Sequence, residues 1–296
     1  MQQDIATAAE STRTLSEPGE RRSVALPVID IVPTSGWRGV NFADLWAYRQ
    51  LLYILVWRDL KVRYRQTLLG VVWVMGQPLI TMLIFTAVFN RLARIESGEI
   101  PYPVFVLAGL LPWGFFAAGV SSAANSLLGN SNLITKVYFP GLLIPAASVT
   151  AALIDFAVAG FVLAGMVAWH RIVPSPTLVF LPLVILLAVA LTLGLGVWLA
   201  ALNVKYRDVR VIIPFMLQVW MFATPVVYPQ ALLPERWRAL AALNPMTGVV
   251  EGFRWCLFGG DSPILALATA SIAAVVLLGT GMLFFRRMER TFVDVI

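Results

Sequence analysis

The chain has 296 residues, of which 59% are hydrophobic and 13% are charged, whereas soluble domains are about 45–50% apolar and about 25% charged. Several stretches of about 20 residues carry no charge, enough for a helix to cross a hydrocarbon core of about 30 Å. This composition excludes a soluble domain and predicts an all-α integral membrane protein. The net charge of +6 is explained by basic residues at cytoplasmic ends of spans, since no nucleic-acid-binding motif occurs.

Residues 1–40 are polar, with little periodicity. No apolar segment follows the arginines at positions 13, 21 and 22, so a signal peptide is not expected. We interpret this region as a flexible cytoplasmic tail.

Residues 41–66 are predicted to form an amphipathic helix in the membrane interface. The apolar run 51–57 is too short to span, and Arg58, Lys61 and Arg65 follow it with the i, i+3, i+7 spacing of one helical stripe. Aromatic residues opposite such a basic stripe are typical of interfacial helices. The alternative is a juxtamembrane stretch with no separate role.

Residues 67–296 are predicted to form a domain with six transmembrane helices. The predicted spans are 68–90, 103–127, 142–169, 178–202, 211–228 and 264–285. A polar segment at 129–140 reads as a short helix or loop outside the membrane. The region 229–262 is too polar to span and reads as two short helices separated by Asn244 and Pro245. Placing both termini in the cytoplasm puts most of the flanking lysine and arginine inside, as the positive-inside rule requires.

Asp155 is the only acid deep inside a predicted span, where an ionisable group costs about 2.5–3.5 kcal/mol on insertion scales. A proton relay would need a second ionisable group nearby, and no other acid, lysine, arginine or histidine lies at that depth in the predicted spans. We therefore favour an interhelical hydrogen bond over a relay.

Catalytic and metal-binding signatures are missing from the sequence. The single Cys256 excludes an intramolecular disulfide, and the single His170 excludes a histidine-rich metal site. No G-x-x-x-x-G-K-[ST] loop occurs, so the chain is not expected to bind a nucleotide itself. Glu251 with Asp261 is a weak candidate for a catalytic acid pair. We expect no catalytic residue, metal site or cofactor on this chain.

Aromatic residues are frequent in and near the predicted spans. Such rings are lipid-facing, core or interfacial, but rings that line a pore could also offer flat faces to sugar rings. The candidates for pore lining are Trp73, Phe85, Phe89, Phe215, Trp220, Phe222 and Tyr228.

Five ordered blocks resemble the permease subunits of ABC transporters that export polysaccharide, the type-2 exporters for O-antigen, teichoic acid and capsule. The blocks are LLGVVWVMGQPLITMLIFTAVF, NLITKVYFPGLLIP, NVKYRDVRVIIPFMLQVWMFATPVVYP, LNPMTGVVEGFRW and ERTFVDVI. The resemblance covers about residues 45–296 and leaves out 1–40. It implies a homodimer in the bacterial inner membrane, docked on two copies of a cytoplasmic ABC ATPase that holds ATP and Mg²⁺. The implied substrate is a lipid-linked polysaccharide, which passes through a channel lined by the first and fifth spans and the aromatic candidates.

The resemblance also implies roles for particular residues. In a coupling helix at 129–140, the residues facing the ATPase would be Asn132, Thr135, Lys136 and Tyr138. The lipid pyrophosphate would arrive near Arg58, Lys61, Arg63 and Arg65. Two short helices at 231–256 would form a periplasmic gate that includes Pro245, Met246, Glu251, Arg254 and Trp255.

Purely structural interpretations of these residues stay open. Lys136 could be an ordinary positive-inside charge, and the basic residues at 58–65 could anchor phospholipid. Met246, Glu251 and Arg254 could simply lie on the solvated face of an outer helix. Rival functions are an ABC exporter for a drug or free lipid, a membrane-embedded sugar or acyl transferase, and a passive channel.

Overall fold

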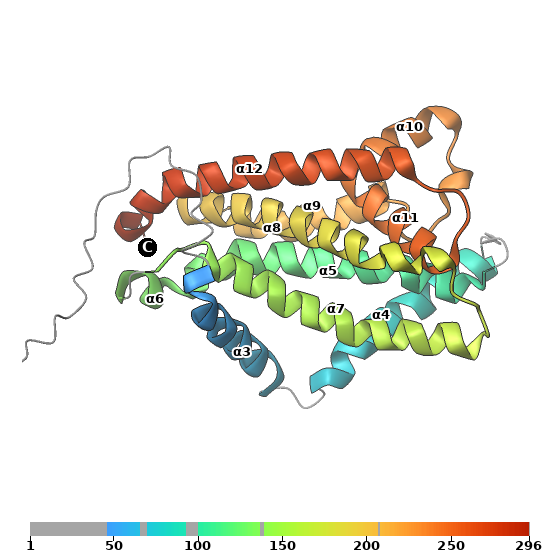
Figure 1. The fold of residues 1–296 in the computed structure, drawn as a ribbon, viewed down its shortest axis with the longest axis horizontal. Coiled ribbons are helices and arrows are strands. Elements are labelled where there is room, and N and C mark those ends of the chain that lie inside the picture. The colour runs from blue at the N-terminus through green and yellow to red at the C-terminus, as the bar shows by residue number, and fades with distance from the viewer. Residues whose placement is uncertain (1–45, 66–69, 93–99, 137–138, 207, 296) are drawn as a thin grey trace, which may run out of the picture. The chain divides into compact units, whose positions relative to one another are not determined.

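The computed structural model describes residues 46–65, 70–92, 100–136, 139–206 and 208–295. Regular secondary structure within these ranges is helical throughout, which confirms the predicted all-α class (Figure 1). The predicted tail at 1–40 and the candidate coupling residue Tyr138 lie outside the described residues.

The helices follow one another along the chain with short connections. The longer ones are α3 (Arg49–Arg65), α4 (Gly70–Phe85), α5 (Tyr102–Gly129), α7 (Leu143–Trp169), α8 (Leu181–Lys205), α9 (Val209–Ala223), α11 (Pro245–Phe258) and α12 (Ile264–Val295). The shorter ones are the π-helix η1 (Thr86–Leu92), α6 (Ser131–Lys136), η2 (Pro176–Phe180), η3 (Gln230–Leu232) and α10 (Glu235–Leu243). α3 lies within the predicted 41–66 helix, and its place at the membrane surface stays a prediction.

Five helices in the described part of the chain are long and apolar enough to cross a membrane. They correspond to the first, second, third, fourth and sixth predicted spans. Their bounds are Val72–Phe89, Tyr102–Gly129, Leu143–Trp169, Pro176–Lys205 and Ile264–Glu289. α12 continues as a helix to Val295, past the predicted end of its span at residue 285.

The predicted fifth span at 211–228 is shorter in the structure. α9 has 15 residues, about 22 Å at about 1.5 Å per residue, which is less than a hydrocarbon core of about 30 Å. The helix ends at Ala223, and Thr224 is extended, with φ −104° and ψ 137°. Thr224 precedes Pro225, and a residue before proline disfavours the α conformation.

α5 is the central helix of the bundle. Over an apolar stretch of 18 residues in α5, 78% of the residues are buried, against 28% or less in the corresponding stretches of the other four candidate spans. It packs against α7 and α8 through small residues. A methyl group built on Gly119 would lie 2.5 Å from the Thr192 side chain, and one on Gly196 would lie 2.7 Å from Ala123. Small residues at these crossings therefore allow the backbones to approach closely.

Two buried apolar clusters hold the helices together. The larger one joins α5, α7, α8 and α11. The smaller one, which we call the α6-end core, joins Leu55 of α3, Phe139, Leu143 of α7, Val197 of α8 and Phe285 of α12. Figure 1 shows α6 and the C-terminal end of α12 at one end of the bundle, and α10 and α11 at the other.

Candidate functional site

Asp155 on α7 binds two side chains from the end of α3. The Arg63 guanidinium donates to Oδ2 and forms an ion pair, and the Tyr64 hydroxyl donates to Oδ1. The Asp155 side chain is only 17% exposed. Arg63 belongs to α3, outside the predicted spans, and reaches Asp155 because α3 packs against α7.

Tyr64 is protonated at neutral pH, as its hydrogen bond to Asp155 requires. Burial raises the pKa of Tyr64 to about 12, and the hydrogen bond to Asp155 acts in the same direction. The hydroxyl therefore stays protonated at neutral pH and can donate to an ionised carboxylate. Both oxygens of Asp155 have fixed partners, which favours the structural interpretation of this residue over a proton relay.

We expect Asp155→Ala and Arg63→Ala to be non-additive. Each change removes the same ion pair, so a double-mutant cycle should give a coupling free energy of about 1–2 kcal/mol. Thermal unfolding of the four proteins in lipid nanodiscs measures it. Additive losses would show that the pair does not fix α3 on α7.

The other predicted basic residues of α3 differ in their surroundings. Arg58 Nη2 lies 2.8 Å from Oδ1 of its neighbour Asp59. Lys61 is exposed. The backbone of Arg65 ends α3, and its side chain lies outside the described residues. Contact of these residues, and of Arg63, with a lipid pyrophosphate stays a prediction.

α6 presents polar side chains to the surface. Asn132, Thr135 and Lys136 are exposed, whereas Leu133 and Ile134 pack on the α6-end core. The apolar side of this short helix is thus held by the bundle, and its polar side is open to a partner. The predicted contact with an ATPase is compatible with this arrangement and stays a prediction.

Arg254 on α11 is buried and surrounded by backbone carbonyls. It is 4% exposed, and Nη1 donates to the carbonyl of Pro225 at 2.8 Å and to Glu251 Oε1 at 3.0 Å. Nη2 donates to the carbonyl of Val226, and Nε lies 3.3 Å from the carbonyl oxygen of Phe105 on α5. The interpretation of Arg254 as part of a solvated helix face is therefore wrong.

Two other side chains hold the same stretch of backbone. The Tyr102 hydroxyl on α5 donates to the carbonyl of Val227 at 2.6 Å. Asn244 Oδ1 accepts from Trp220 Nε1 at 2.9 Å, and Asn244 Nδ2 donates to Thr224 Oγ1 at 2.9 Å. These contacts fix the end of α9 and the following turn against α5, α10 and α11. We call the three holding residues the α9 latch: Tyr102, Asn244 and Arg254.

The remaining predicted gate residues surround this latch. Met246 is fully buried, so it too is not on a solvated face, and its backbone N–H is capped by Asn244 Oδ1 at 3.1 Å. Pro245 begins α11 at a position that suits proline. Trp255 stacks on Phe180, with ring centroids 5.5 Å apart. A gating movement of these residues stays a prediction.

Three of the predicted channel aromatics lie on open faces of α4 and α9. Trp73 is 54% exposed, Phe215 is 67% exposed and Phe222 is 54% exposed. Phe85 and Phe89 are half-buried against each other, with centroids 5.8 Å apart. The rings of Trp73, Phe215 and Phe222 thus contribute more than half of their area to the surface of the described part of the chain.

Trp220 and Tyr228 have contacts inside the protein. The Trp220 ring packs edge-on against Phe116 at 5.3 Å, besides its hydrogen bond to Asn244. The Tyr228 hydroxyl donates to the carbonyl of Phe222 at 3.1 Å. Trp220 thus connects α9 to its latch, a contact that the prediction of channel lining did not include.

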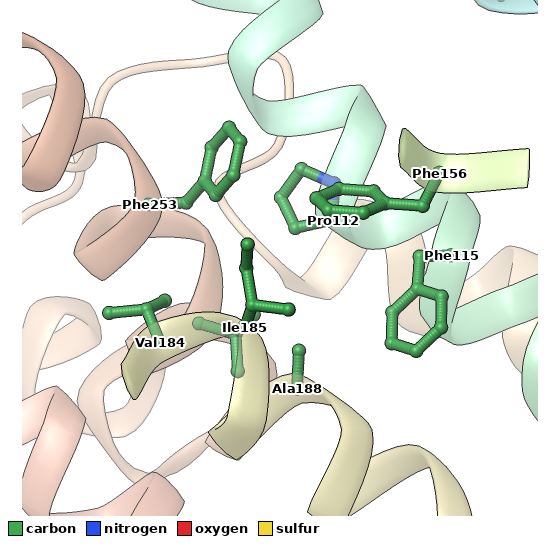
Figure 2. A pocket seen from close by; sticks show the side chains of 8 residues that line it. Pro112, Phe115, Phe156, Val184, Ile185, Ala188 and Phe253 are labelled. Carbon is green, nitrogen blue, oxygen red and sulfur yellow. The ribbon is translucent and has the colours of Figure 1, made fainter. Parts of the chain in front are cut away.

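A small pocket between α5, α7, α8 and α11 is lined by apolar side chains (Figure 2). In Figure 2 Phe115, Phe156 and Phe253 surround a space that also borders Ala188 and Ile185. Its cavity volume is about 10 Å³, room for about one water molecule. A sugar ring would find no polar lining atom here, so this pocket does not serve as a path for a polysaccharide.

Acidic and metal-binding chemistry is sparse in the parts of the chain that the structure covers. There, no three His, Cys, Asp or Glu side chains are grouped so that they could hold a metal ion. Glu251, half of the weak catalytic pair from the sequence, is bound to Arg254. This contact gives Glu251 a structural partner.

Comparison with known proteins identifies the family of such a bundle. The sequence profile described as ABC-2 type transporter matches residues 50–258. The chain is 34% identical over 252 residues to the O-antigen export system permease protein RfbA of Myxococcus xanthus, covering 83% of this chain and 95% of that protein. It is 25% identical over 247 residues to the RfbA protein of Klebsiella pneumoniae, with the same coverage. It is 24% identical over 236 residues to the polysialic acid transport protein KpsM of Escherichia coli, covering 78% of this chain and 91% of that protein.

Proposed function

The chain belongs to the ABC-2 type transporter family, and we propose that two copies form the channel of an exporter that moves lipid-linked polysaccharide across the bacterial inner membrane. It is a multi-pass permease of a polysaccharide exporter, a transport subunit. The observation that carries this function is its likeness to an O-antigen export permease over 83% of this chain and 95% of that protein. The lipid carrier, the dimer and the separate ATPase are the proposed parts.

We infer six crossings, with both termini in the cytoplasm. Gly141 at the start of α7 and Glu289 near the end of α12 are hydrogen-bonded to each other, so the chain returns to the same side between them. An even number of crossings is then needed, and α7, α8 and α12 supply three. The short α9 with residues 224–228 is the fourth, and α4 and α5 complete the six.

Energy for transport comes, in this proposal, from a separate cytoplasmic ATPase present in two copies. The nucleotide and Mg²⁺ belong to that partner, since the sequence has no Walker loop. Asn132, Thr135 and Lys136 on the exposed side of α6, with Tyr138, form the docking surface. Movement of α6 tilts the bundle and opens a pore between the two copies.

The substrate meets the protein first at α3. Lys61 is exposed there, and Arg58 is 39% exposed although it has a carboxylate neighbour. Both can reach an anionic pyrophosphate through charge-assisted hydrogen bonds. Arg63 has a different role in this proposal. Its ion pair with Asp155 fixes the orientation of α3, and with it the positions of Arg58 and Lys61.

The polymer passes along the open faces of α4 and α9. Trp73, Phe215 and Phe222 offer flat rings that stack on sugars without binding one register strongly. A second copy of the chain would cover these faces and enclose the path. The gate helices α10 and α11 would close its outer end.

Deletion of the gene tests the function. Lipid-linked polymer should accumulate inside the cells while surface polymer disappears, and the wild-type gene should restore the surface polymer. Fractionated cells and extraction of lipid-linked intermediates measure both pools. If no polymer is made at all, the chain acts in synthesis, and if both pools are unchanged, an exporter of a drug or free lipid takes the place of this proposal.

A further inference from the structure

The C-terminal part of α12 holds the backbone just before α7. Glu289 Oε1 accepts a hydrogen bond from the backbone N–H of Gly141 at 2.9 Å. Gly141 lies five residues after Lys136, the last residue of α6. α12 is therefore attached close to the exposed helix that we propose as the ATPase docking surface.

Close packing makes this attachment specific. A methyl group built on Gly141 would lie 2.7 Å from Glu289 Oε1 and 3.4 Å from the ring of Phe285. Phe285 is fully buried in the α6-end core, together with Phe139 and Leu143 from the same segment. The Glu289 carboxylate and the Phe285 ring thus hold the start of α7, with Phe139 and Gly141 before it, from one side of α12.

The N-terminal part of α12 contacts both predicted gate helices. The Thr269 hydroxyl donates to the carbonyl of Ala242 in α10 at 2.6 Å. Gly248 of α11 packs directly on the backbone of Ala266, without space for a side chain. Between Thr269 and Glu289 the helix is unbroken, and 20 residues span about 30 Å.

α8 supports α12 along this length. Gly194 and Gly281 meet at the crossing, where a methyl group on Gly281 would lie 2.8 Å from the carbonyl oxygen of Gly194. The Trp198 ring stacks on Phe284 with centroids 4.4 Å apart. This support keeps α12 from bending independently of the bundle.

We propose that Glu289 is a positioning residue that fastens Gly141, just before α7, to α12, and that α12 carries the movement of α6, which packs on the α6-end core beside Phe285, to the gate helices α10 and α11. The proposal rests on the proposed function, since it needs an ATPase that acts on α6. Coupling requires one element that both sites contact and that moves with both. α12 is hydrogen-bonded to Gly141 at one end and to Ala242 of α10 at the other.

The first test separates ATP hydrolysis from export in the complete transporter. Glu289→Ala should reduce export about tenfold while the complex still assembles and hydrolyses ATP within about twofold of the wild type. Glu289→Gln should restore much of the export, because its amide oxygen can still accept from Gly141. Arg287→Gln, an exposed change on the same turn of α12, is the control and should match the wild type.

The outcomes of this test are distinct. Export and hydrolysis that fall together would place Glu289 in ATPase docking, and unchanged export in Glu289→Ala would overturn the proposal. Wild-type protein that fails to export in the same assay would refute the proposed function instead.

A cross-link supplies the second test at the other end of α12. Thr269→Cys and Ala242→Cys, in a Cys256→Ser background, would join α12 to α10 by a disulfide when oxidised. Export should persist in the cross-linked transporter, because α10 moves together with α12. Export that stops on oxidation and returns on reduction would show that the gate must move against α12, which would overturn the proposal.

Discussion

Arg254→Met is expected to stop export and to lower the free energy of unfolding by about 3–5 kcal/mol, the usual effect of breaking a buried ion pair. The change leaves Glu251 without its partner and leaves the carbonyls of Pro225 and Val226 without a donor. Methionine fills a similar apolar volume, so the loss comes from the missing hydrogen bonds more than from a cavity. The end of α9 would then separate from α5 and α11.

Two further variants make the result for Arg254 interpretable. Arg254→Lys keeps the charge but cannot reproduce the planar fork of donors, so an intermediate loss of stability and export is expected. Arg236→Met changes an exposed arginine on the neighbouring α10 and should behave as the wild type. Thermal unfolding in nanodiscs and surface-polymer assays give both readouts. Wild-type stability in Arg254→Met would mean that the α9 latch does not hold this segment.

The membrane-crossing helices could be predicted from the sequence because their signal is local. A run of about 20 uncharged apolar residues needs no knowledge of its neighbours. Five of the six predicted spans coincide with long apolar helices in the structure. The short α9 had a local signal too, since Pro225 forces Thr224 out of the helical conformation. Asn244 followed by Pro245 likewise predicts the start of a helix, because asparagine caps helices and proline suits the first helical position.

The contacts of the candidate sites could not be predicted in this way. Asp155 and Arg63 are 92 positions apart, and only the packing of α3 on α7 brings them together. Besides Glu251, the partners of Arg254 are backbone carbonyls, as is the partner of Tyr102, and any residue type can supply a carbonyl. A sequence shows that a buried cation needs acceptors, but it does not show which turn of the chain provides them.

Gly248→Ala is expected to give the largest effect of any methyl addition at a glycine that the structure describes, and to impair export. A methyl group at this position would overlap the carbonyl of Ala266 and lie 2.9 Å from Cβ of Ala270. Backbone atoms cannot rotate away as a side chain can, so α11 and α12 would have to separate. Such overpacking costs about 1–3 kcal/mol, and it would loosen the contact of the gate helices with α12.

Glycines in other surroundings provide the matched controls for Gly248→Ala. Gly165 on α7 has no atom within 4 Å of an added methyl group, and at Gly252 on α11 the methyl would meet the flexible tip of Leu267. All three changes gain the same helix propensity, about 0.8–1 kcal/mol, so differences between them report packing alone. Thermal unfolding should rank Gly165→Ala as the most stable, Gly252→Ala next and Gly248→Ala last. Equal stabilities would show that α11 and α12 are not as close together as the contact between Gly248 and Ala266 requires.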